Sequence, residues 1–341
     1  MRTFVVLALL TVAFAALAAT IDPALPDYVP RPATPPPGAK YVLPDGTIRI
    51  VSANRGFGVA IEGFNALFAR SHPGVRFQVD YNVGGNALNM AALAYGVTLV
   101  CPFARDVNDL ERATYEHVVG GAPFQLNIAH GTLTSPRMTA SMAIYVNKDN
   151  PIHRLTMDQV KRIFTTGTPG GDLSTWGQVG AIGSWAARPI HAYGTPEPSG
   201  YGYFMLKTKW DDRRYVSGME TFDLAADIVK RVGQDPDGIG FAGQGFLTAE
   251  TQLVALADHP QGPYLQGTEA EVASGAYPLD RYVGLALRLE PGKPLDPFAR
   301  EYMRLILSKQ GQEIVSAEAD GFVPLNATQV AEQLAKLENV P

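Results

Sequence analysis

Three short stretches of the chain combine helix-capping residues with glycine in a way that suits an anion. They run from Ser52 to Phe57, from Asn82 to Asn86 and from Ser199 to Tyr201. Each lies where a β-rich run ends and a helical pattern begins. The start of a helix exposes unpaired N–H groups and about half a positive charge, and glycine lets a ligand approach that backbone closely. The three junctions are therefore predicted to line a ligand crevice.

The residues expected to bind this ligand supply backbone N–H groups, short polar side chains, two arginines and two aromatic rings. They are Ser52, Asn54, Arg55, Gly56, Phe57, Gly84, Gly85, Asn86, Arg105, Ser199, Gly200 and Tyr201. The alternative at any single junction is simpler, because serine and asparagine often only cap a helix and glycine often only makes a turn. Each arginine could equally be a surface residue paired with an acid such as Asp106. Tyr201 is expected to be exposed in the crevice.

Signatures of enzymes and metal sites are missing. The sequence has no Gly-x-Ser-x-Gly elbow, no Gly-x-x-x-x-Gly-Lys loop and no His-Glu-x-x-His helix. The six histidines show no paired ligand spacing, so we expect surface or hydrogen-bonded core histidines, no metal and no cofactor. The run from Asp235 to Gly238 lacks the further ligands of a calcium loop and is better explained as a turn. Asn326 begins a glycosylation pattern that often arises by chance.

Composition and the first residues predict an exported globular protein. The 341 residues are 46% apolar, enough for a large core. Residues 1–19 carry Arg2, an apolar stretch and a small-residue end, which is typical of a cleavable secretory signal and too short for a membrane anchor. Without that segment, 27 basic residues face 33 acidic ones, a net charge of −6, which argues against a nucleic-acid partner. Cys101 is the only cysteine, so neither a disulfide nor a lipid anchor is expected.

The remaining chain alternates β-rich and helical runs, which predicts an α/β fold with a parallel sheet covered by helices on both faces. A Pro-rich arm at 20–45, with seven prolines between Asp22 and Gly38, is expected to be extended. Strands are expected at 47–53, 75–81, 97–103, 142–147, 188–194, 238–243 and 281–289. Helices are expected at 57–71, 86–96, 155–164 with Thr156 as its N-cap, 199–210, 223–233 ending at Gly233, 296–308 and 327–337.

At several of these runs the chain resembles the periplasmic phosphate-binding proteins of ABC transporters, within the type II periplasmic binding protein superfamily. The resemblance rests on "YVNKDNPIHRLTMDQVKRIFTTG", "LSTWGQVG", "RPIHAYGTPEPSGYGYF", "DGIGFAGQGF", "YPLDRYVGLAL" and "GKPLDPFAREYMRLILSKQGQEIV" followed by "GFVPL". It implies an α/β fold of two lobes with a hinge and an interlobe cleft. It also implies one lobe from residues 46–110 and 278–341 and another from 111–277. The implied ligand is phosphate, with a different oxyanion or an organic acid as alternatives, and an ABC permease as partner of a periplasmic monomer.

The chain departs from the phosphate motif of this family, which reads Arg, three residues, then Ser-Gly-Thr. Thr195 stands at the arginine position and Tyr201 at the last threonine, while Ser199 and Gly200 remain. An arginine fork of two charged hydrogen bonds is worth about 3–6 kcal/mol, so its loss would weaken binding about a hundred- to ten-thousand-fold. Two other functions stay open: an interaction or sensing module that docks through the Pro-rich arm, and a hydrolase that uses Ser199.

Overall fold

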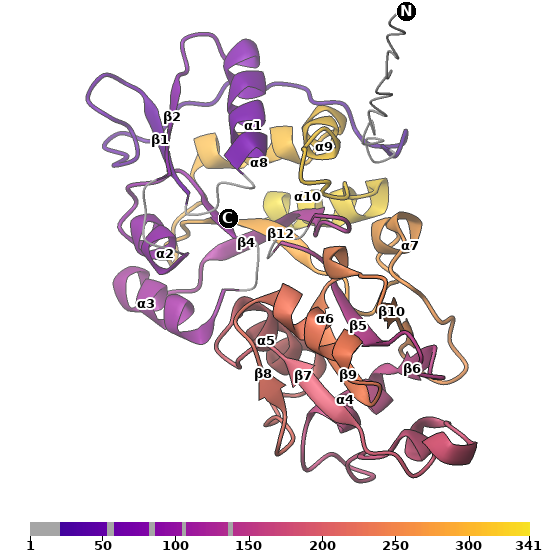
Figure 1. Cartoon of the computed structure of the whole chain (residues 1–341). Helices are drawn as coiled ribbons and strands as arrows, with labels where there is room; N and C mark the ends of the chain where they lie inside the picture. Colours follow the sequence, from indigo (N-terminus) through magenta and orange to yellow (C-terminus); the bar gives the residue numbers. More distant parts are fainter. Residues whose placement is uncertain (1–20, 53–57, 82–85, 104–106, 136–138) are drawn as a thin grey trace, which may run out of the picture.

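The computed structural model describes residues 21–52, 58–81, 86–103, 107–135 and 139–341. These residues form two bodies, one above the other in Figure 1, which are joined by segments that cross between them. We call the upper body the first lobe and the lower body the second lobe. Each has its own cluster of buried apolar side chains, so each lobe folds around a separate core.

Two small sheets form the centre of the first lobe. Strand β1 (Ile48–Val51) pairs in parallel with β2 (Phe77–Asp80). Strand β12 (Tyr282–Leu287) lies between β3 (Cys101–Phe103) and β4 (Phe124–His130) and is antiparallel to both. The prediction of a parallel sheet is therefore confirmed for β1 and β2 and wrong for the sheet of β3, β12 and β4. The chain leaves this lobe along β4 and returns to it along β12, so these two strands run in opposite directions.

Six helices cover these sheets. They are α1 (Gly58–Ser71), α2 (Asn86–Ala94), α3 (Asp109–Val119), α8 (Pro297–Ile306), α9 (Lys309–Ser316) and α10 (Ala327–Asn339). An aromatic cluster joins α1 to α8, because the ring of Phe68 lies 5.1 Å from that of Phe298 and 5.6 Å from that of Tyr302. Asn108 caps α3 in a capping box with Glu111, and this helix was not predicted from the sequence.

The second lobe contains one mixed sheet of five strands in the order β10-β5-β9-β7-β8. Its members are β5 (Met142–Asn147), β7 (His191–Gly194), β8 (Glu220–Thr221), β9 (Gly238–Gly243) and β10 (Thr251–Leu253). Strands β7, β8 and β9 run in parallel, whereas β5 is antiparallel to β9 and β10. Strand β5 is buried along its whole length, as its unbroken apolar run suggests.

Short helices pack against this sheet. They are α4 (Met157–Phe164), α5 (Gly200–Phe204), α6 (Ala225–Gln234) and α7 (Glu269–Ala273), beside a pair of short strands β6 (Arg154–Thr156) and β11 (Ala255–Ala257). Thr156 caps α4 as predicted. Gly233 does not end α6, which continues through Gln234 before Asp235. The side chains of Trp176 and Trp210 are fully buried and fill the core of this lobe.

The Pro-rich arm is extended, as predicted, but it is part of the first lobe. Leu25 is 5% exposed and belongs to that lobe's core. The Tyr28 hydroxyl donates to the Glu301 carboxylate of α8 at 2.7 Å, and the backbone N–H of Arg31 donates to the same carboxylate at 2.9 Å. An arm held in this way has little of the freedom that a docking tail needs.

The division of the chain into lobes at residues 110 and 111 stays a prediction. Strand β4 pairs with β12 along its length, so the sheet favours a boundary close to His130. In the part of the chain that the structure describes, none of the helices has both the length and the apolar character needed to cross a bilayer.

Candidate functional site

The segments that link the two lobes lie side by side and are tied together by hydrogen bonds. The N–H of Gly131, just after β4, donates to the carbonyl of Arg281 at 2.7 Å. The N–H of Met142, at the start of β5, donates to the carbonyl of Leu279 at 3.0 Å. The N–H of His130 donates to Val323 at 2.8 Å, which adds a third segment from the C-terminal part. We call residues 130–132, 139–142 and 279–282 the crossing.

A buried polar network fixes the backbone of the crossing. The His130 imidazole is fully buried, and its Nδ1 lies 2.6 Å from Asp280 Oδ2. The Ser141 hydroxyl donates to the other oxygen of Asp280 at 3.1 Å, and His130 Nε2 lies 3.1 Å from Gln329 Oε1. Buried polar groups that are paired in this way specify one arrangement of the chain. Arg281, the next residue, is therefore held in a defined position.

The Ser199 junction is a helix start in which the side chain of Ser199 is already engaged. Its Oγ accepts from the N–H of Gly202 at 3.0 Å and donates to Thr195 Oγ1 at 2.7 Å. Thr195 is 1% exposed, and its carbonyl accepts from the Tyr215 hydroxyl at 3.1 Å. Ser199 thus caps α5, which is the simpler of the two interpretations.

Tyr201 is not exposed in a crevice, and that prediction is wrong. Its side chain is 0% exposed, because it is the second residue of α5 and points into the packing between α5 and the crossing. The Arg281 guanidinium lies 5.0 Å from the centre of the Tyr201 ring and 5.1 Å from that of Phe204. Burial raises the pKa of the Tyr201 phenol to about 12, and the positive charge of Arg281 opposes that shift.

Arg281 is a buried cation that the sequence did not single out. It is 3% exposed, and its Nη1 donates to the carbonyl of Ala140 at 3.3 Å. Taking a guanidinium out of water is costly unless hydrogen bonds, aromatic faces or an opposite charge compensate. The carbonyl of Ala140 and the ring faces of Tyr201 and Phe204 are among the groups that compensate this buried charge at the joint between the lobes.

Several side chains in the described part of the structure carry buried polar atoms that make no hydrogen bond, and three of them lie at the crossing or near the start of α2. Two are the hydroxyls of Thr132, which is 0% exposed, and Thr139, which is 6% exposed; both belong to the crossing. The third is Asn89, one turn into α2 and 0% exposed, where neither the amide nitrogen nor the oxygen has a partner. Such groups each cost about 1–3 kcal/mol, so proteins rarely keep them without a use.

The other predicted site residues divide into two groups. Ser52 is buried at the end of β1, where its N–H donates to the carbonyl of Asp80 at 3.0 Å, and Asn86 is the first residue of α2. The remainder lie outside the described residues: Asn54, Arg55, Gly56, Phe57, Gly84, Gly85 and Arg105. The convergence of all three junctions therefore stays a prediction.

The lobes also touch through an ionic contact between α3 and α5, which lie next to each other in Figure 1. Asp109, the first residue of α3, accepts from the Tyr203 hydroxyl of α5 at 3.2 Å and pairs with Lys207 at 3.1 Å. Lys207 holds the pKa of the Asp109 carboxyl below its usual range. The contact joins α3 of the first lobe to α5 and the turn that follows it in the second lobe.

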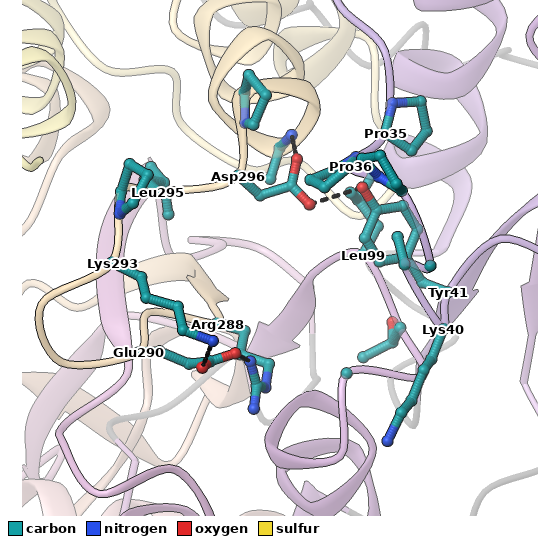
Figure 2. Close-up of a pocket in the computed structure, with 18 of the residues that line it drawn as sticks. Pro35, Pro36, Lys40, Tyr41, Leu99, Arg288, Glu290, Lys293, Leu295 and Asp296 are labelled. Carbon is teal, nitrogen blue, oxygen red and sulfur yellow. Dashed lines mark hydrogen bonds and ion pairs between the residues drawn. The ribbon is translucent and has the colours of Figure 1, made fainter.

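Two cavities, of about 760 and 500 Å³, flank the Pro-rich arm. The larger one lies between the arm and the segment that leads into α8. In Figure 2, Arg288 and Lys293 both contact Glu290, and the Tyr41 hydroxyl donates to Asp296 at 2.7 Å. Three of the charged groups that line this cavity, Arg288, Glu290 and Lys293, are thus paired with each other, and none of the predicted site residues contributes to it.

The turn at Asp235 brings together three side chains whose ligand atoms lie within 4.8 Å of one another, namely His191, Asp235 and Asp237. Asp235 already accepts from the Tyr193 hydroxyl at 2.6 Å and lies 2.7 Å from His191 Nδ1. Asp237 pairs with Arg188. The N–H of Gly238 closes the turn on the Asp235 carbonyl at 2.9 Å. These bonds explain the group as the turn that the sequence predicted.

Comparison with known proteins agrees with this architecture. A family model described as the PBP superfamily domain matches residues 43–310. The phosphate-binding protein PstS of Pseudomonas aeruginosa is 34% identical over 328 residues, which cover 94% of this chain and 93% of that protein. The chain belongs to the PBP superfamily, in the PstS family. Protein SphX of Synechococcus elongatus is 29% identical over 194 residues, 55% of this chain and 54% of its own.

Solved structures of the PstS family share the fold at low sequence identity. PstS of Borrelia burgdorferi superposes with a TM-score of 0.54 at 12% identity and covers 82% of this chain and 99% of its own. An ABC-type phosphate transport receptor of Vibrio cholerae gives a TM-score of 0.53 at 15% identity, with 80% and 98% covered. These likenesses confirm the predicted two-lobe type II fold with a hinge and an interlobe cleft.

Proposed function

We propose that this protein is a periplasmic receptor that captures phosphate between its two lobes and presents it to an ABC-type permease. The observation that carries the proposal is the 34% identity to PstS of Pseudomonas aeruginosa across 94% of the chain. An identity that extends over both lobes and the crossing includes every element that a closing receptor needs. Fold similarity alone would not support a ligand, because one fold serves many functions.

The geometry of the described residues supports an anionic ligand. The crossing holds the buried hydroxyls of Thr132 and Thr139, which make no hydrogen bond among the described residues and can donate to an oxyanion. The contact of Asp109 with Lys207 and Tyr203 gives the lobes a means of staying closed around a guest. Closure removes water from the ligand and so strengthens each of its hydrogen bonds.

The hydrogen bonds of Ser199 are consistent with a protein that binds its ligand without changing it chemically. A serine nucleophile needs a base within hydrogen-bond reach. Ser199 Oγ bonds to the Thr195 hydroxyl and to the backbone N–H of Gly202, neither of which is a base. A hydrolase is therefore not favoured.

Isothermal titration of the purified protein with phosphate tests the proposal. We expect a dissociation constant in the micromolar range or below, which corresponds to about −8 kcal/mol or more negative. Sulfate and a small organic acid, titrated in parallel, test the other anions that the family pattern leaves open. If phosphate at millimolar concentration gives no heat and either competitor binds clearly, that competitor's class of anion is the ligand and phosphate is not.

Export is a separate part of the proposal and has its own test. Residues 1–19 are proposed to be removed on secretion, which leaves the arm as the new N-terminus. N-terminal sequencing of the protein recovered from the periplasmic fraction is expected to begin close to residue 20. Recovery of the intact chain from the cytoplasmic fraction would contradict this step.

A further inference from the structure

The ionic contact between the lobes shares one lysine between two aspartates. Lys207 Nζ lies 3.1 Å from Asp109 Oδ2 of the first lobe and 2.7 Å from Asp212 Oδ2 of its own lobe. Asp109 also accepts from the Tyr203 hydroxyl at 3.2 Å. Asp212 first, and then Asp109, raises the pKa of Lys207 above its usual range, so this side chain is positively charged. Lys207 therefore connects the two lobes while it keeps a partner inside the second one.

The two helices that carry this contact are each anchored in a different lobe. Tyr115 of α3 is fully buried, and its hydroxyl accepts from the N–H of Leu289 at 3.0 Å, just after β12. Phe204 of α5 is buried in the core of the second lobe. Because each helix moves with its own lobe, the contact between Asp109 and Lys207 breaks when the lobes separate.

Both charged groups keep an ion pair after such a separation. Asp109 pairs with Arg112, one turn later in α3, at 2.6 Å, and Lys207 keeps Asp212. Opening the lobes therefore leaves neither charge without a partner. Exposed ion pairs are weak, and the Asp109 side chain is 58% exposed. The contact is thus suited to holding the lobes together reversibly.

Asp212 opposes the contact as well as replacing it. The carboxylates of Asp109 and Asp212 both lie within 3.1 Å of the same Nζ, so closing the lobes brings two negative charges close together. The backbone of Asp212 has a φ of 58°, and its N–H donates to the Leu206 carbonyl at 2.8 Å. This turn belongs to the second lobe alone, so it holds Asp212 beside Lys207 whether the lobes are together or apart.

The contact also lies close in the chain to residues predicted to bind the ligand. Arg105 precedes Asp109 by four positions, and Ser199 caps the helix that carries Tyr203. A change in how firmly the two lobes are held together is therefore expected to reach a ligand bound between them. The affinity of a receptor falls when its closed form is less populated.

We propose that Asp109, Tyr203 and Lys207 form a latch between the lobes, and that Asp212 weakens this latch so that a bound ligand can leave. All four are positioning residues, because they act on the opening and closing of the lobes. The inference rests on the proposed function, since it concerns a receptor that closes around phosphate. It assigns opposite effects to two aspartates that contact the same lysine.

The test compares Asp109→Asn and Asp212→Asn with a matched control, Asp211→Asn. Asp211 is the neighbour of Asp212, has a similar φ of 52° and pairs with Lys161 of the second lobe at 3.0 Å, so its ion pair does not cross between lobes. All three carboxylates are more than half exposed, and asparagine tolerates a positive φ, so each variant is expected to fold. Thermal unfolding checks this.

Phosphate affinity is measured by isothermal titration, and the rate of phosphate release by stopped-flow fluorescence. We expect Asp109→Asn to bind about threefold more weakly than the parent, with faster release, which is the size of effect typical of an exposed ion pair. Asp212→Asn is expected to bind about threefold more tightly, with slower release, because the repulsion of Asp109 is removed. Asp211→Asn is expected to match the parent.

Salt provides a readout that a merely structural role would not change. Screening shortens the range of charge interactions from about 10 Å at 0.1 M salt to about 3 Å at 1 M. The difference in phosphate affinity between the parent and Asp109→Asn is therefore expected to shrink as sodium chloride is raised over this range. A difference that stays the same would show that the substitution acts through local structure, and would overturn the latch.

The outcomes separate the latch from the function on which it rests. If the parent binds phosphate and Asp109→Asn and Asp212→Asn both match it or change in the same direction, the latch is wrong and the function stands. If the parent binds no phosphate, the proposed function falls, and small-angle X-ray scattering of the ligand-free proteins decides on the latch. Asp109→Asn should then have a larger radius of gyration than the parent and Asp212→Asn a smaller one. Equal radii in all three proteins would overturn it.

Discussion

The crossing and the cavities beside the Pro-rich arm are opposite in character. The cavities are large, about 760 and 500 Å³, yet the smaller one is lined by no charged side chain, and in the larger one Glu290 is paired with both Arg288 and Lys293. At the crossing, the buried hydroxyls of Thr132 and Thr139 make no hydrogen bond among the described residues, although they are packed among the segments that link the lobes. Volume by itself thus marks a poor candidate for an anion site. Buried polar groups kept at a cost to stability mark a better one.

The largest effect is expected from Asp280→Ala. This change leaves the fully buried His130 ring and the Ser141 hydroxyl without their shared partner, so we expect the free energy of unfolding to fall by about 3 kcal/mol. The matched change near the arm, Asp296→Ala, removes the cap of α8 and the bond from Tyr41 and is expected to cost about 1 kcal/mol. Urea unfolding at pH 7 measures both. Equal losses would erase the distinction between the two regions.

Glu318→Gln tests whether the Glu318 carboxylate destabilises the C-terminal segment next to the crossing. Burial, together with Asp320 and Glu62, raises the pKa of Glu318 from 4.5 to about 7. A carboxyl whose pKa is raised in the folded state destabilises the protein as pH rises through that interval. Glu318→Gln is therefore expected to be more stable than the parent at pH 8, by at most about 3 kcal/mol, and equal to it near pH 4.

The control for Glu318→Gln is the exposed neighbour Glu313 on α9. Glu313→Gln is expected to change stability by less than about 0.5 kcal/mol at either pH, because surface substitutions rarely do more. Thermal unfolding at pH 4, 6 and 8 measures both variants. A Glu318→Gln variant that is less stable than the parent at pH 8 would show that the carboxylate has a favourable partner in the folded protein.

Thr139→Val sharpens the comparison between groups that serve the fold and groups that serve a ligand. Its hydroxyl has no partner, so we expect stability to stay the same or rise slightly while phosphate affinity falls about tenfold. Thr165, also buried, donates to the carbonyl of Lys161 at 2.7 Å. Thr165→Val is expected to lose about 1 kcal/mol of stability and no affinity. Titration with phosphate and urea unfolding distinguish the two, and an unchanged affinity in Thr139→Val would show that this hydroxyl does not serve the ligand.

The smallest effect is expected from Lys293→Ala in the larger cavity beside the arm. Lys293 is 66% exposed in its side chain and is paired with Glu290, so its loss should change stability by less than about 0.5 kcal/mol. Phosphate affinity is expected to stay within twofold of the parent. If titration instead shows a large loss, the anion binds beside the arm and the contrast between the regions is reversed.

Local sequence patterns predicted most of the elements but not how they are assembled. Thr156 caps its helix as expected, because capping depends on residues within one turn. The predicted parallel pairing was confirmed for β1 and β2 but was wrong for β4 and β12, since their direction depends on where the chain crosses between lobes. Tyr201 was misplaced for a related reason: whether an aromatic ring is exposed depends on what packs over it, and here that is Arg281.

The sequence alone determined the export signal that we infer, the extended arm, the helix starts with their capping residues and the family resemblance that the comparisons confirm. These follow from composition and from contacts between residues close along the chain. Only the tertiary structure decided that Arg281 packs against Tyr201 and Phe204 of α5 and that Thr132 and Thr139 are hydrogen-bonded neighbours in the crossing. Residues far apart in the chain become neighbours when two lobes share their linking segments, and no local pattern encodes that meeting.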